Sequence, residues 1–194
     1  MLVKWTSRLL IASALVLLAV PGFARDKNEV IDATAWGTST QTGKNFGVTV
    51  TIYQYSTPED RQILVEAFQK GSNQGLVNAL ERMKAVGHIA ITGTLGYDLS
   101  FVQMIPTATG RTIRFVTNRP IRWGEAYWDT QSQYYNLSGG EIIVNDQDKS
   151  KSSGVLYPAA QLGIDDQGQL SLNLLQNPWR LSNIIDWKGI PGEN

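Results

Sequence analysis

The chain has 194 residues, no cysteine, one histidine, and 17 acidic and 17 basic side chains. The lack of cysteine excludes disulfides, thiol catalysis and cysteine-ligated zinc, and a single histidine excludes multi-histidine metal sites. The balanced charge argues against nucleic acid or an anionic membrane as the main partner.

The first 24 residues predict a cleaved signal peptide. Lys4 and Arg8 form a basic start, residues 9–20 form an apolar run, and residues 21–24 supply the small residues of a cleavage site. This apolar run has 12 residues, whereas a helix needs about 20 to span the hydrocarbon core of a membrane. An uncleaved amphipathic anchor is the alternative. Cleavage leaves 15 basic and 17 acidic side chains on residues 25–194, a net charge of −2. We therefore expect a periplasmic or secreted single domain with no stable transmembrane anchor.

Alternating apolar and polar residues predict the strands of the first half of this domain. Residues 30–36 and 46–55 predict a β-hairpin. Residues 87–117 predict three consecutive antiparallel strands joined by glycine-marked turns. In the second of these, strict alternation places Leu99 and Phe101 on the same face of the sheet.

A helical segment at about 57–85 separates the hairpin from the three-stranded unit. Thr57 suits a helix cap and Pro58 the first helical position. Gly71 is predicted to stop a first helix, and Asn73 to open a second. Each helix has one apolar stripe, so we expect an αα-hairpin packed on one surface of the sheet.

Shorter strand signals fill the rest of the chain. They lie at residues 141–145, 155–164 and 170–174, and a final apolar element covers 179–187. About eight antiparallel strands predict an α+β, mainly antiparallel β fold: a meander barrel, or a two-layer sandwich, carrying the αα-hairpin.

The segment 118–140 has no clear period but is rich in aromatic residues. Loops of this length are uncommon unless they are functional or disordered, and this composition is too aromatic for disorder. Aromatic faces beside acids and an arginine suit sugars, cyclic ligands or protein partners. The alternative is that the rings cap one end of the barrel as ordinary core. The candidate ligand-binding residues are Arg122, Trp123, Glu125, Tyr127, Trp128, Asp129, Tyr134 and Tyr135.

Other polar features are interpreted as structural. His88 is expected to be an exposed or hydrogen-bonded strand residue without chemistry, because no G-x-S-x-G motif accompanies it. Residues 146–150 match the opening of a calcium loop, but Lys151 stands at its glycine position, which favours a solvated loop. Solvated surface charge is also expected for the arginines of the central segment, Arg111, Arg114, Arg119 and Arg122.

Three stretches resemble a family of small, uncharacterised exported bacterial proteins of the acidobacterial type. They are ITGTLGYDLSFV, RFVTNRPIRWGEAYWDT and NDQDKSKSSGVLYPA. The resemblance implies export and a single domain. It carries no activity and no catalytic residues.

These observations favour a non-enzymatic module that binds an apolar or aromatic-stacking ligand, or an envelope protein, without cofactor, metal or catalytic residues. One alternative is a hydrolase, for instance on glycans, in which Glu125 and Asp129 share the acid and base roles. A structural envelope component is another. A filled barrel interior favours the partner or structural hypothesis, and an open one favours a ligand.

Overall fold

The computed structural model describes residues 28–119, 135–164 and 170–187. Nine strands, one α-helix and two short 3₁₀ helices make up this part of the chain. The helices are η1 (Ser39–Gln41), α1 (Pro58–Arg82) and η2 (Lys149–Lys151). The strands are β1 (Glu29–Trp36), β2 (Asn45–Ile52), β3 (Gly87–Ile91), β4 (Tyr97–Thr107), β5 (Gly110–Thr117), β6 (Leu137–Asn145), β7 (Ser153–Ile164), β8 (Leu170–Leu174) and β9 (Trp179–Asp186).

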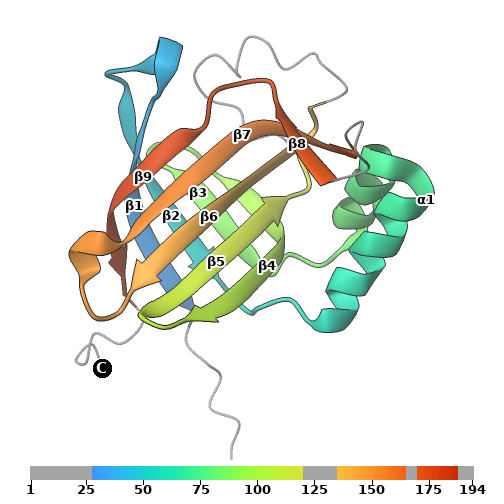
Figure 1. Cartoon of the computed structure of the whole chain (residues 1–194), viewed down its shortest axis with the longest axis horizontal. Helices are drawn as coiled ribbons and strands as arrows, with labels where there is room; N and C mark the ends of the chain where they lie inside the picture. The colour runs from blue at the N-terminus through green and yellow to red at the C-terminus, as the bar shows by residue number, and fades with distance from the viewer. Residues whose placement is uncertain (1–27, 120–134, 165–169, 188–194) are drawn as a thin grey trace, which may run out of the picture.

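Eight of the strands form a closed antiparallel barrel (Figure 1). The order runs β6-β5-β4-β3-β2-β1-β9-β7, and a further pairing of β6 with β7 closes the ring. β8 stays outside the ring because it pairs with β7 alone. The predicted barrel is therefore confirmed in place of the sandwich. The three-stranded unit at residues 87–117 is β3, β4 and β5.

Alternation along the strands directs one face of each into a single apolar core. In β1 the buried and part-buried positions alternate from Glu29 to Ala35. The core is filled by branched aliphatic side chains together with Phe115 and Trp179, each only 1% exposed. Phe46 packs on Trp179 with ring centroids 4.6 Å apart. The interior is thus a packed core, as expected for a barrel of this strand number.

The predicted αα-hairpin is wrong. The structure has one helix, α1, which is interrupted by non-helical backbone at Gly71 and Ser72 but resumes at once without a connecting loop. Such Gly/Ser pairs are a common cause of sharp kinks. The chain passes so close to itself beyond the kink that a Cβ at Gly75 would lie 2.3 Å from the carbonyl oxygen of Ala67. Only glycine fits there.

The start of α1 follows the sequence prediction. Thr57 caps the helix, and the Asp60 side chain accepts a hydrogen bond from the Thr57 backbone N–H at 2.8 Å. This reciprocal arrangement satisfies two donors that the helix would otherwise leave unpaired. α1 then packs against the outside of the barrel, next to β4 and β7 (Figure 1).

Candidate functional site

Most of the sequence-predicted recognition loop lies outside the described residues. This applies to Arg122, Trp123, Glu125, Tyr127, Trp128, Asp129 and Tyr134, and also to the predicted signal peptide. Tyr135 is described and is part-buried at the entrance to β6. The loop as a recognition surface therefore stays a prediction.

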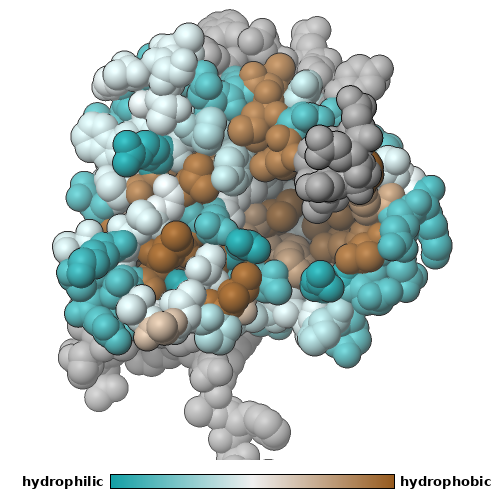
Figure 2. Space-filling view, in the orientation of Figure 1, coloured by the Kyte–Doolittle hydropathy of each residue, from teal (hydrophilic) through white to brown (hydrophobic). Residues whose placement is uncertain are grey.

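The most ligand-like feature is a cleft on the outside of the barrel, which we call the α1 cleft. Its main lobe, about 680 Å³, lies between the kinked helix and the barrel wall. A second lobe of about 240 Å³ adjoins it and shares Leu76, Val116 and Leu162. Figure 2 shows apolar side chains gathered in this hollow beside α1. The main lobe is lined by Arg61, Leu64, Val65, Phe68, Gln69, Ser72, Leu76, Phe101, Val116, Leu162 and Ile164.

A β-bulge explains why an aromatic ring points outward into the cleft. Strict alternation predicts that Phe101 faces the interior with Leu99. The pairing of β4 with β5 shifts register between these two residues, so Leu99 and Val102 are buried while Phe101 is only part-buried. A one-residue shift sends every later side chain to the opposite face. The predicted face of Phe101 is therefore wrong, and the ring packs in the cluster between α1 and the wall.

Asn73 fixes the distance between α1 and the barrel. Its side-chain oxygen accepts the backbone N–H of Leu162 in β7 at 2.8 Å, and its amide donates to Asn136 Oδ1 at 2.7 Å. Asn136 in turn donates to Gln74 at 3.2 Å. Asn73 is 6% exposed, so the two bonds that it makes itself are partly shielded from water, whereas the bond between Asn136 and Gln74 is exposed. The residue that the sequence predicts to open a second helix instead holds one wall of the cleft in place.

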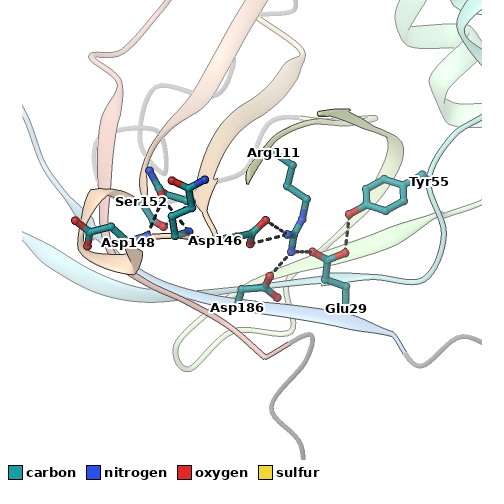
Figure 3. A network of polar contacts seen from close by, with 9 residues as sticks. Glu29, Tyr55, Arg111, Asp146, Asp148, Ser152 and Asp186 are labelled. Atoms are coloured by element: carbon teal, nitrogen blue, oxygen red, sulfur yellow. Dashed lines mark hydrogen bonds and ion pairs between the residues drawn. The ribbon is translucent and has the colours of Figure 1, made fainter. Parts of the chain in front are cut away.

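A second polar assembly, the Arg111 cluster, lies at one end of the barrel (Figure 3). Arg111 Nη2 contacts Glu29 Oε1 at 2.8 Å and also Asp186, and Nη1 contacts Asp146 Oδ1 at 3.0 Å. The Tyr55 hydroxyl donates to Glu29 Oε2 at 2.6 Å. The Arg111 side chain is 16% exposed, so its predicted role as solvated surface charge is wrong.

Burial and the carboxylates together shift two pKa values in the Arg111 cluster. Burial by itself lowers the pKa of Arg111, but the hydrogen bond and charge of Glu29, with the charges of Asp186 and Asp146, more than offset this and raise it. The pKa of Tyr55 is raised by burial first and then by its bond to Glu29. Both groups therefore keep their protons, so that Arg111 stays a cation and Tyr55 a neutral hydrogen-bond donor.

The Arg111 cluster is suited to holding strands together rather than to chemistry. Its members come from β1, β5, β9 and the segments after β2 and β6, so it ties five parts of the chain at one barrel end. The adjoining hollow, lined in part by Asp146 and Asp186, is only about 60 Å³. That space is far below the roughly 300–1,000 Å³ of typical ligand pockets.

The remaining polar candidates have structural partners. His88 Nε2 lies 2.9 Å from the carbonyl of Leu95, and Nδ1 lies 3.3 Å from Asp98. Asp148 accepts the Ser150 backbone N–H at 3.1 Å and so caps η2 within the predicted calcium-like loop. Across the described residues, no group of three or more His, Asp or Glu side chains is placed to hold a metal ion.

Comparison of the chain with family models, with curated proteins and with solved structures gives no match. The resemblance to exported acidobacterial proteins therefore stays an expectation. The described residues include no helix with the length and hydropathy needed to cross a bilayer.

Proposed function

We propose that this protein is an exported, non-enzymatic binding protein that holds a small apolar or amphipathic molecule in the α1 cleft. The observation that carries the proposal is the size and lining of the main lobe. About 680 Å³ bounded mainly by aliphatic and aromatic side chains falls within the range of small-molecule sites.

The packed barrel interior supports a binding site outside the barrel. Phe115 and Trp179 fill the space that a ligand inside the barrel would need. The outer wall at Phe101 and Val116 is apolar instead, and the packed core behind it makes it rigid. Ile164 and Leu172 on its rim are 57% and 45% exposed. A bound apolar molecule would remove part of this surface from water, at about 25 cal/mol per Å².

Binding of the uncharged dye Nile red tests this proposal. We expect saturable binding by the wild type, measured as a fluorescence increase. Val116→Trp, which places an indole in the cleft, should weaken it at least about tenfold, equivalent to about 1.4 kcal/mol.

Val155→Trp is the matched control, since Val155 is a part-buried valine of the same barrel and is absent from the lining of both lobes. Equal weakening in both variants, or unchanged binding in Val116→Trp, would contradict the proposed site. The hydrolase alternative depends on Glu125 and Asp129, which lie outside the described residues, and no described residue favours it.

A further inference from the structure

The two ends of the α1 cleft differ in charge. Arg61 lines the main lobe and also a third hollow of about 300 Å³, which continues past Phe101 toward Ser56 and Gln103. Arg61 is exposed, and it has no ion pair with any residue that the structure describes. A guanidinium therefore stands where the apolar lobe meets a more polar one.

The acids nearest to Arg61 in sequence are occupied or turned away. Asp60 accepts the capping hydrogen bond from Thr57 at 2.8 Å. Glu66 lies 3.7 Å from Lys70 and also accepts from Gln62 at 3.1 Å. Glu59 is two positions from Arg61 on the helix and so does not share its face. The positive charge at this end of the cleft is thus not cancelled locally.

At the other end of the cleft the charges are already paired. Arg114 Nε contacts Glu141 Oε2 at 2.6 Å, and both residues line the second lobe. Tyr157 beside them adds no charge, and burial and then the charge of Glu141 raise its pKa further above the neutral range. An anionic group placed there would meet an arginine that already has a carboxylate partner. Arg61 is the better site for it.

We propose that the ligand is an amphiphile with one anionic group, a carboxylate or a phosphate, on an apolar chain. The anionic group pairs with Arg61, and the chain lies along Phe101 and Val116 toward Leu76 and the second lobe. This inference rests on the proposed function of the α1 cleft. It adds the charge of the ligand and its direction in the site.

Displacement of Nile red by three dodecyl compounds tests the inference. Dodecanoate, dodecyl phosphate and uncharged dodecanol share one chain and differ in the head group. We expect one or both anions to bind the wild type more tightly than dodecanol. Arg61→Gln should weaken binding of the anions about three- to tenfold and leave dodecanol unchanged, the size expected for a partly exposed charge pair. The effect should shrink as salt is added.

Arg82→Gln supplies the matched control, because Arg82 is an exposed arginine of the same helix and lines none of the three hollows. It should leave the affinity of all three compounds unchanged. The preference of the wild type between the two anions assigns the head group to the carboxylate or the phosphate class.

The possible failures are distinguishable. If none of the compounds displaces the dye and the dye itself does not bind, the proposed function falls together with the inference. If dodecanol binds as tightly as both anions, or if Arg61→Gln has no effect on either anion, the charge inference alone is overturned. An equal loss in Arg61→Gln and Arg82→Gln would also overturn it, because it would show a general electrostatic effect without a site.

Discussion

The Arg111 cluster and the α1 cleft belong to the same barrel but differ in how their groups are partnered. In the cluster, three carboxylates and a tyrosine surround one arginine at one end of the barrel. In the cleft, apolar side chains of the helix and the wall face one another across a space of about 680 Å³. The charged and hydroxyl side chains of the cluster are thus paired with each other. The apolar side chains of the cleft are the ones left available to a ligand.

Replacing Arg111 should give the largest effect on stability. Arg111→Leu leaves three carboxylates close together without their cation, so the free energy of unfolding should fall by about 3–5 kcal/mol. Urea denaturation at neutral pH measures it. Arg114→Leu is the control, because its ion pair with Glu141 lies on the surface, where such pairs contribute about 0–1 kcal/mol. Similar losses in the two variants would show that the cluster is not the stronger element.

Asn73→Ala should have an intermediate effect on stability and a large one on the cleft. It leaves the part-buried backbone N–H of Leu162 without its acceptor, which costs about 1 kcal/mol, the low end of the range for a buried donor. The helix also loses its link to β7, so Nile red binding should weaken. Asn78→Ala, at an exposed position of α1, should change stability by no more than about 0.5 kcal/mol. Unchanged dye binding in Asn73→Ala would mean that Asn73 does not maintain the cleft.

Tyr55→Phe should give the smallest change, and a pH-dependent one. Because the pKa of Tyr55 is raised in the folded protein, the folded state holds this proton more tightly than the unfolded state. The stabilisation is therefore complete below the ordinary tyrosine pKa of 10.0 and is lost as the pH rises above it. Tyr55→Phe should cost about 1 kcal/mol at neutral pH and less at strongly alkaline pH.

The control for Tyr55→Phe is Tyr53→Phe, a neighbouring tyrosine that is 47% exposed. Urea midpoints of both variants and the wild type would be compared on the two sides of pH 10.0. A deficit of Tyr55→Phe that stays constant across this range would contradict the role assigned to the hydroxyl.

The barrel was predictable because its signal is local. Period-two alternation, with glycine at the turns, marks β3 to β5 in the sequence without any knowledge of their partners. The α1 cleft was not predictable in the same way. Its wall depends on the bulge between Leu99 and Phe101, and one unpaired residue leaves no trace in composition while reversing the face of the residues after it.

The Arg111 cluster and the hydrogen bonds of Asn73 were not predicted, for a different reason. Glu29, Arg111 and Asp186 are far apart in sequence and meet only because the barrel closes. Asn73 matched a helix-opening signal, yet its side chain bonds to β7. Propensity describes what a residue can do within its own segment. In both cases the partners of the side chain were set by tertiary contacts instead.

The pairing of β1 with β9 has a consequence for how the chain folds. Ile31 pairs with Asp186, and the hydrogen bond from Trp187 to Asp32 joins residues 155 positions apart. Such long-range pairing makes folding slow, because the chain must lose the entropy of a very long loop before the contact forms. During synthesis, β1 has an unpaired edge until β9 emerges. The ring therefore cannot close until the last strand has been made, although β2 to β6 can already pair with their sequence neighbours.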